Sequence, residues 1–450
     1  MPMIDSRGST MPEELTDEEK MRKIPWSLAF GATSTVFAML TIFGPVFVLF
    51  LNELDLPKTR IGFILSLLPF AGLLALFIAS SVARIGVKRV FVTFYLLRKL
   101  VTSLLILTPW VFSLYGSEVT FLFVTVVVGT FALCRAIAET AIYPWFHEIV
   151  PESFRGRYHG ISHIISLLAS ILALSAASYV MDNYSGLGRF QILVAAGVVF
   201  GLVSVFCVSR VPGGAPQRFE GRKHFGSIRQ ALRDRDLLLY LLGLGLVLLF
   251  LRTVVMAFIP LFMKEQVGLT NGQILLIEVV SYTAGLLSSY LWGWAADHAG
   301  SKSVTLFALS LMLILPVWLM VMPRNHAMSF LLAASALAIT GAASAGWLVG
   351  DQRLLYVNVV PFEKRTEYMA VYYAWMGIVG GVGPIVAGSA LDLFQGLEGN
   401  WWAFTIDPYT PLFIVGLVSL GSGLLILSKI KVEGELGLGK LIARAINRTR

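Results

Sequence analysis

The chain is 450 residues long, 56% of its residues are hydrophobic, 14% are charged, and its net charge is +8. Soluble domains carry about 25% charged residues, so this composition excludes an ordinary soluble protein, and the abundance of apolar residues excludes a disordered one. A polytopic membrane protein is the class that remains. Because the basic residues are not gathered into one stripe, we expect no nucleic-acid partner.

Residues 1–25 are polar and acidic, and we predict that they form a cytoplasmic tail. After this tail come twelve apolar runs, each long enough for a helix that crosses the hydrocarbon layer, which takes about 20 residues. The runs are continuous and do not alternate between apolar and polar residues, which favours helices over barrel strands. The predicted spans are 26–51, 61–83, 90–114, 119–147, 160–181, 189–209, 237–263, 272–296, 303–322, 327–358, 367–390 and 409–430.

The longest connection between spans, residues 210–236, divides the twelve spans into two sets of six. It begins rich in Pro and Gly and ends as a basic amphipathic stretch, which is typical of a linker followed by a helix on a membrane surface. We therefore predict a six-helix bundle over residues 26–209, a second bundle over 237–430 and a cytoplasmic tail over 431–450.

The two halves resemble each other in sequence. Three segments of the first half have counterparts in the second half, in the same order and at offsets of 210 to 214 residues. Parallel repeats of this kind are a recognised plan of membrane transporters, with the substrate site at the midplane between the repeats. The paired segments are LDLPKTRIG (54–62) with VGLTNGQIL (267–275), RIGVKRV (84–90) with HAGSKSV (298–304), and VPESFRGRYHG (150–160) with VPFEKRTEYMA (360–370).

The basic residues predict the orientation of the chain. Most of the 35 Lys and Arg residues fall in the two tails and in the loops on the same side as the tails. Cytoplasmic loops carry such an excess, so we expect both termini to be cytoplasmic in a multi-pass protein of the cell membrane. The loops on the other side hold only Lys58, Arg60, Arg189, Lys264 and Arg324.

At its repeated loops the chain resembles the major facilitator superfamily, over about residues 26–430. The family's loop motif, G-x-x-x-D-x-x-G-x-[RK]-[RK], follows the second and the eighth span, and in the first copy Ala79 and Ala83 replace the glycine and the aspartate. The resemblance implies an all-α membrane fold with twelve helices in two pseudo-symmetric bundles of six, and a conformational latch at these loops. The latch residues that it implies are Gly293, Asp297, Gly300 and Lys302 in the second copy, and Gly86, Lys88 and Arg89 in the first.

Two further segments resemble motifs of the same family. Glu148 and Arg155 are similar to a charge pair of its sugar porters, with Arg365 at the corresponding place in the second half, and the resemblance adds all three to the latch. The segment GGVGPIVAG (380–388) resembles a Gly-Pro motif that the family's antiporters carry in span five. Since span five lacks it here, we interpret this segment as a site of close helix packing by small residues.

Charged residues inside a span are costly and are functional candidates by default. Arg135 lies near the middle of span four and Arg252 near the middle of span seven, two spans that face the central cavity in this superfamily. Because guanidinium groups suit carboxylates and phosphates, we interpret the two as a clamp for an anionic solute. The alternative is structural pairing, since Glu139 follows Arg135 by one helical turn. Arg98 and Lys99 are expected to extend toward the cytoplasmic surface.

Proton coupling requires a carboxylate that changes its protonation as access alternates. Burial raises the pKa of carboxylates in general and so favours such a change near neutral pH. Glu139 is the first candidate, since its protonation would release Arg135, and Asp351 and Glu278 follow. A permanent ion pair is the alternative for each of them.

Several other side chains are candidates for solute binding. Arg353 lies in the inner half of span ten, and Tyr143, Tyr356 and Tyr372 are placed where they would line the inner part of a cavity. An aromatic lining suits ring-bearing or amphipathic solutes. Packing or interfacial anchoring is the alternative for each tyrosine.

The sequence as a whole predicts a secondary active transporter that moves a small polar, possibly anionic, organic solute by alternating access, coupled to a proton or another ion. Nothing resembles an ATP-binding loop, and we expect neither a metal, nor another cofactor, nor an enzymatic activity. A monomer in the lipid bilayer is expected. The alternatives are a multidrug-type efflux antiporter and a receptor on the same fold that binds a ligand without moving it.

Overall fold

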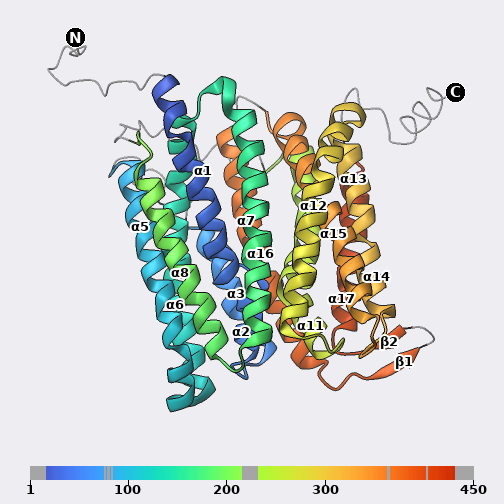
Figure 1. Cartoon of the computed structure of the whole chain (residues 1–450). Coiled ribbons are helices and arrows are strands. Elements are labelled where there is room, and N and C mark those ends of the chain that lie inside the picture. Colours follow the sequence, from blue (N-terminus) through green and yellow to red (C-terminus); the bar gives the residue numbers. More distant parts are fainter. Residues whose placement is uncertain are drawn as a thin grey trace, which may run out of the picture.

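Two bundles of helices stand side by side in the computed structural model of this chain. Figure 1 shows the first half of the sequence in blue to green and the second half in yellow to red. The structure describes residues 17–74, 78, 82, 85–214, 232–361, 365–401 and 404–430.

The first half consists of helices. Its elements are α1 (Asp17–Leu40), α2 (Pro45–Asn52), α3 (Lys58–Gly72), α5 (Val87–Ser103), η1 (Leu104–Leu107), α6 (Thr108–Ile149), η2 (Glu152–Phe154), α7 (Arg155–Asn183) and α8 (Gly188–Ser209). The short elements η1 and η2 are 3₁₀ helices.

The second half repeats this plan and adds a two-stranded antiparallel hairpin. Its elements are α10 (Arg235–Phe250), η3 (Leu251–Phe258), α11 (Ile259–Glu265), α12 (Asn271–Ala299), α13 (Ser301–Met312), α14 (Ile314–Val321), α15 (Ser329–Arg353), η4 (Leu354–Val359), α16 (Arg365–Leu393), β1 (Gly399–Trp401), β2 (Phe404–Ile406) and α17 (Thr410–Leu427). We call the end at which α1 begins and α17 ends the proximal end, and the opposite end, where α2 ends and α12 begins, the distal end (Figure 1).

The helices agree with the predicted spans. In the described part of the chain, ten helical segments are long and apolar enough to cross a membrane. One of them, Val87–Ile142, contains two predicted spans, because α6 continues from α5 and breaks at Gly116, where φ is 74°. The predicted span 61–83 begins in α3, of which 15 residues are described. The predicted all-α membrane fold is therefore confirmed.

The first helix starts earlier in the sequence than the first predicted span. The first helix begins at Asp17, before the predicted span at residue 26, and three acidic residues stand in its first turn. Negative charge is favourable there because it faces the positive end of the helix dipole. Most of the linker predicted over 210–236 and the tail predicted over 431–450 lie outside the described residues.

The two halves pack against each other through α3 on α16 and through α7 on α12. The first contact is very close, because a β-carbon added to Gly62 would stand 2.1 Å from the backbone oxygen of Pro384. Pro384 belongs to the segment GGVGPIVAG, and Gly381 of the same segment lies against the ring of Phe70. The small residues of this segment therefore allow close helix packing, as the sequence analysis interpreted them.

Candidate functional site

The first helix of each half is interrupted at corresponding positions. Residues 41–44 are not helical, and α2 begins at Pro45; in the second half a π-helix, η3, leads into α11, whose first turn contains Pro260. The sequences around the two prolines match as FGPVF (43–47) and FIPLF (258–262), at an offset of 215 residues. This pair of prolines was not predicted from the sequence, although the matching segments of the repeat contain it.

These interruptions have a physical cause and mark a candidate site. Proline lacks the N–H that continues a helix, and its ring clashes with the carbonyl four residues earlier, so it starts a new helical segment more readily than it continues one. Discontinuous helices at corresponding positions of two repeats are the best pointer to a transporter's binding site. π-Helical turns inside longer helices also occur often at functional sites.

Arg135 lies on α6 beside the interruption of the first half. Its Nε donates to Oε1 of Glu139 at 2.6 Å, so the pairing weighed in the sequence analysis is present. Its guanidinium also lies over the ring of Phe43, 4.6 Å from the ring centre, and Phe43 belongs to the interrupted segment. The side chain of Glu139 is 46% exposed and that of Arg135 is 27% exposed, so the pair is open to solvent or solute.

Arg252 lies in the π-helix of the second half. It packs beside Gly383 of α16, and its Nη1 lies 3.5 Å from the sulfur of Met256, which is a weak acceptor. Among the described residues no carboxylate forms an ion pair with it. A β-carbon added to Gly380 of α16 would stand 3.2 Å from Pro69 of the first half and 3.9 Å from Nε of Arg252, so Arg252 lies near the interface between the halves. Each of the two predicted arginines thus lies at the interrupted first helix of one half.

Two more cations lie inside the first half, and here the expectation from sequence was wrong. Lys99 has 0% exposure and Arg98 has 8%, so neither extends to the surface. The Nζ of Lys99 has no hydrogen-bond partner in the part of the chain that the structure describes, and it lies 3.2 Å from the centre of the Phe37 ring. The guanidinium of Arg98 lies over Tyr95. Attraction between a cation and an aromatic face explains how this interior holds them.

The two other predicted carboxylates lie in the second half in different surroundings. Asp351 is buried on α15, and its Oδ1 accepts a hydrogen bond of 2.8 Å from the hydroxyl of Tyr240. Glu278 is half-buried on α12, one turn before Tyr282, whose hydroxyl lies 3.7 Å from the sulfur of Met39 in the first half. Glu278 is therefore on a helix face near the other half, whereas Asp351 is bound within its own half.

The remaining predicted binding residues are more scattered. Nη1 of Arg353 donates to Oδ1 of Asp297 at 2.6 Å, and both side chains are exposed near the proximal end. Tyr372 lies beside Tyr240, with 6.4 Å between ring centres, and Tyr356 is exposed in η4. The side chain of Tyr143 lies outside the described residues.

The second copy of the loop motif forms a compact turn. Asp297 receives Arg353, Lys302 donates to the backbone oxygen of Ile430 at 2.6 Å, and Gly300 has a φ of 85°, which favours glycine. A side chain at Gly293 would meet open space. The motif therefore ties α12 to α15, and α13 to the residues that follow α17, within one half.

The first copy and the charge pair also make contacts within their own half. Lys88 donates to the backbone oxygen of Val211 at 2.6 Å, while Arg89 is exposed. Oε2 of Glu148 accepts from the backbone N–H of Gly214 at 3.0 Å, and Nε of Arg155 donates to the oxygen of Val150. The side chain of Arg365 lies outside the described residues.

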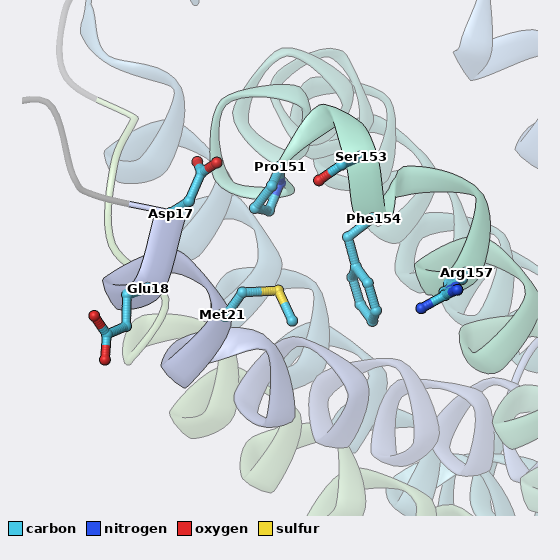
Figure 2. Close-up of a pocket in the computed structure, with 7 residues that line it drawn as sticks. All are labelled: Asp17, Glu18, Met21, Pro151, Ser153, Phe154 and Arg157. Atoms are coloured by element: carbon cyan, nitrogen blue, oxygen red, sulfur yellow. The ribbon is translucent and has the colours of Figure 1, made fainter.

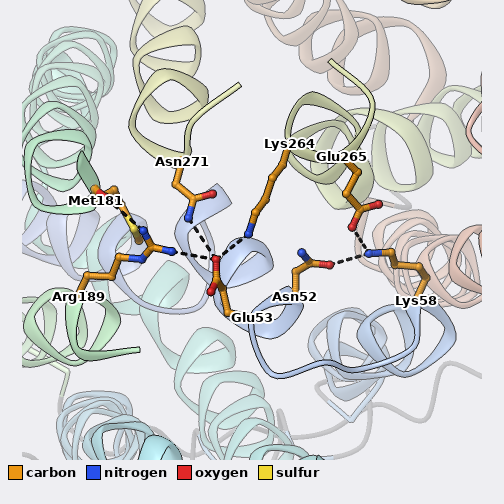
Figure 3. Close-up of polar contacts among 8 residues, drawn as sticks. All are labelled: Asn52, Glu53, Lys58, Met181, Arg189, Lys264, Glu265 and Asn271. Atoms are coloured by element: carbon orange, nitrogen blue, oxygen red, sulfur yellow. Dashed lines mark hydrogen bonds and ion pairs between the residues drawn. The ribbon is translucent and has the colours of Figure 1, made fainter. Parts of the chain in front are cut away.

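A network centred on Glu53 joins the halves at the distal end (Figure 3). Its Oε1 accepts from Arg189 of its own half at 2.8 Å and from Lys264 of the other half at 2.6 Å, with Asn271 at 3.5 Å. Burial raises the pKa of Glu53, but the hydrogen bond and charge of Lys264 and the charge of Arg189 outweigh it, so the pKa lies below its ordinary value. Lys58 pairs across the same interface with Glu265.

A surface pocket of about 460 Å³ lies at the proximal end of the first half. It stands between the start of α1 and the turn that leads into α7, with Met21 and Phe154 between the acidic Asp17 and Glu18 on one side and Arg157 on the other (Figure 2). Since its lining comes from one half only, it is separate from the interface that holds Arg135 and Arg252.

The sequence profile of the major facilitator superfamily matches this chain twice, over residues 29–252 and 241–440. Together these matches cover nearly the whole of the two helical bundles. No curated protein sequence matches the chain closely enough to count as a relative.

Solved structures of membrane transporters share the fold. A mutant of the nucleoside transporter NupG has 13% identity and a TM-score of 0.65, covering 92% of this chain and 100% of that one. A bacterial homologue of the iron transporter ferroportin in its inward-facing state has 12% identity and a TM-score of 0.66, with 91% and 98% covered. A D-xylose–proton symporter has 13% identity and a TM-score of 0.64, with 92% and 97% covered. At these identities the likeness concerns the fold.

Proposed function

The chain belongs to the major facilitator superfamily, and on this premise we propose that it is a secondary active transporter for a small organic anion. The observation that carries the proposal is the placement of Arg135 and Arg252, one from each half: Arg135 lies over the ring of Phe43, and Arg252 packs beside Gly383 of α16, the helix that contacts α3 of the first half. Both arginines lie beside the interrupted first helices of the two repeats. Discontinuous helices at the repeat interface are where transporters of this plan bind their solutes.

The charges at this interface select the class of solute. Two guanidinium groups at one site repel each other, and an anion bound between them replaces this repulsion with attraction to both. The planar fork of each guanidinium matches a carboxylate or a phosphate through two parallel hydrogen bonds. A solute bound in this way contacts both halves, so its binding free energy depends on how the halves are oriented.

The distal network supports alternating access as the mechanism. With the proximal end assigned to the cytoplasm, where the basic residues accumulate, contacts such as Glu53 with Lys264 close the outer side. Opening the outer side requires that these contacts break while the proximal loops approach each other. Asp297 and Arg353, which pair within the second half, then belong to the latch of the opposite state.

For proton coupling we propose Glu139 as the exchanging carboxylate. It is half-exposed and holds Arg135 through a direct ion pair, so a proton on Glu139 frees Arg135 for the solute. Proton binding and anion binding then assist each other, which is the requirement for symport. Asp351 and Glu278 are the alternatives, in that order.

Binding measurements on purified protein test the clamp. A panel of small carboxylates and organic phosphates is screened by thermal shift, and the affinity of each binder is measured by calorimetry for the wild type, Arg135→Gln and Arg252→Gln. We expect each variant to weaken anion binding by about tenfold or more, the value of a charge-assisted hydrogen bond. Arg60→Gln is the matched control, because Arg60 pairs with Glu118 of its own half. Unchanged anion affinity in both variants would refute the clamp.

Counterflow in proteoliposomes tests transport itself. Exchange of labelled for unlabelled anion across the membrane is the expected result, stimulated by an inward proton gradient and made insensitive to that gradient by Glu139→Gln. Binding without exchange would identify a receptor, and binding of lipophilic cations in place of anions would identify an efflux protein. Either outcome overturns the proposal.

A further inference from the structure

Two aspartates occupy equivalent places in the two repeats at the distal end. Asp182 stands in the last turn of α7 and Asp392 in the last turn of α16. They are 210 residues apart, which is the offset of the neighbouring repeat VPESFRGRYHG and VPFEKRTEYMA. Each aspartate reaches the first turn of a helix in the other half, so the two contacts are reciprocal.

Asp392 caps the start of α3. Its Oδ1 accepts from the backbone N–H of Lys58 at 3.0 Å, and its Oδ2 accepts from the N–H of Thr59 at 2.8 Å. The residue before α3 is Pro57, which offers no side-chain cap. The first N–H groups of a helix have no partner inside the helix, and a carboxylate that accepts from them also benefits from the helix dipole. The other half therefore provides the side-chain cap of α3.

Asp182 makes the equivalent contact with the start of α12, but there the helix already has a cap. Oδ1 of Asp182 accepts from the hydroxyl of Thr270 at 3.2 Å, and its carboxylate lies so close to Gly272 that an added β-carbon would stand 2.1 Å from Oδ2. Thr270 and Gln273 form a complete capping box of their own. Removing Asp182 therefore leaves α12 capped, whereas removing Asp392 leaves α3 uncapped.

We propose that Asp182 and Asp392 are the gate residues of the distal end, two reciprocal helix caps that hold the halves together, and that Asp392 carries the larger share. This inference rests on the proposed alternating access. When the distal end opens, α3 loses its cap and exposes two N–H groups to water, whereas α12 keeps its capping box. Of the two caps, the one that Asp392 gives to α3 therefore favours the closed state more.

Distance measurements across the distal end test this gate. Nitroxide labels on Leu114→Cys of the first half and Met328→Cys of the second half report the separation, because both positions are exposed. The buried native cysteines Cys134 and Cys207 are replaced by alanine. The full chain in lipid nanodiscs is measured by double electron–electron resonance, and the ratio of the long to the short distance gives the ratio of open to closed populations.

The two aspartates should differ in how strongly their substitution opens the distal end. We expect Asp392→Asn to raise the open-to-closed ratio by about five- to tenfold, because the amide keeps one acceptor oxygen but loses the second hydrogen bond and the charge that faces the start of α3, and we expect Asp182→Asn to raise it less. The matched control is Asp55→Asn, which removes the same charge from an exposed loop three residues before α3, where asparagine tolerates the left-handed backbone. An unchanged ratio in Asp392→Asn, or equal effects of Asp182→Asn and Asp392→Asn, would overturn the inference.

A second variant separates gating from the stability of α3. Pro57→Ser gives α3 a cap of its own, so adding it to Asp392→Asn should restore the melting temperature while the distal end stays open. If the double variant also returns to the wild-type distance ratio, Asp392 is a structural cap and no gate. If neither the wild type nor any variant populates the long distance, with or without solute, alternating access itself fails, and with it the proposed function.

Discussion

Removing the charge of Glu53 should open the distal end. Glu53→Gln keeps the size and one acceptor oxygen of the side chain but loses the negative charge that Lys264 and Arg189 share. Only the contact to Lys264 and the longer one to Asn271 cross between the halves, since Arg189 belongs to the same half as Glu53. The contact to Arg189 is weakened equally in the open and closed states, so only the contacts that cross between the halves change the balance, and the substitution should raise the free energy of the closed state relative to the open one.

The size of the effect follows from the geometry. A hydrogen bond to a charged group contributes about 1.5–3 kcal/mol and a neutral one about 1 kcal/mol. The Glu53 side chain is 22% exposed and that of Lys264 is 27% exposed, so solvent screens part of the charge. The difference across the interface is then about 1–2 kcal/mol, which corresponds to a factor of about 5–30 in the open-to-closed ratio.

The label pair on Leu114 and Met328 measures this ratio. Lys264→Gln should reproduce the effect of Glu53→Gln, and the double variant should add little, because both changes break one contact. Arg189→Gln is the control, since it breaks the contact to Glu53 inside one half and should leave the ratio near that of the wild type. The reasoning is refuted if the effects of Glu53→Gln and Lys264→Gln add fully, or if Arg189→Gln opens the distal end as much as they do.

Two further predictions follow from the same interface. The pKa of Glu53 is lowered in the closed state, so its contribution to closure is present above the ordinary carboxyl value, about 4.3, and is lost as the pH falls through the lowered value. The open-to-closed ratio should therefore rise when the pH is lowered through this range. The rise should be smaller in Glu53→Gln. Gly62→Ala should destabilise the protein by about 1–3 kcal/mol, because the new β-carbon meets the backbone of Pro384, whereas Gly72→Ala on the same helix meets open space and should be neutral in a thermal-unfolding assay.

The fold and the local contacts were the predictable part. Apolar runs mark the helices because length and hydropathy alone decide whether a segment crosses a membrane. The ion pair between Arg135 and Glu139 was also predictable, because a spacing of four residues on one helix places two side chains together. The close packing of the segment around Pro384 also followed from residue size.

Contacts that depend on tertiary structure were not predictable in this way. The partners of Glu53 lie far from it in the sequence, and no local pattern relates them. The burial of Lys99 was missed because a lysine near a helix end usually extends to the surface, whereas here aromatic rings from two other helices enclose Lys99 and Arg98. The pairing of Arg353 with Asp297 depends on how α12 and α15 pack.

Some features at the junction of the halves occur in both repeats, whereas the two candidate arginines occur in one repeat each. The interrupted first helices and the aspartates at the distal end occur in both halves at matching offsets, so each half offers the other the same kind of contact. The two arginines do not follow this rule: at the offsets of their neighbourhoods, Ala345 corresponds to Arg135 and Phe37 to Arg252. Under the proposed function, this asymmetry gives the solute two different partners, one held by Glu139 and one without a carboxylate among the described residues. We then expect the duplicated contacts, together with the pair of Glu53 and Lys264, to govern the movement of the halves, and the two arginines that were not duplicated to recognise the solute.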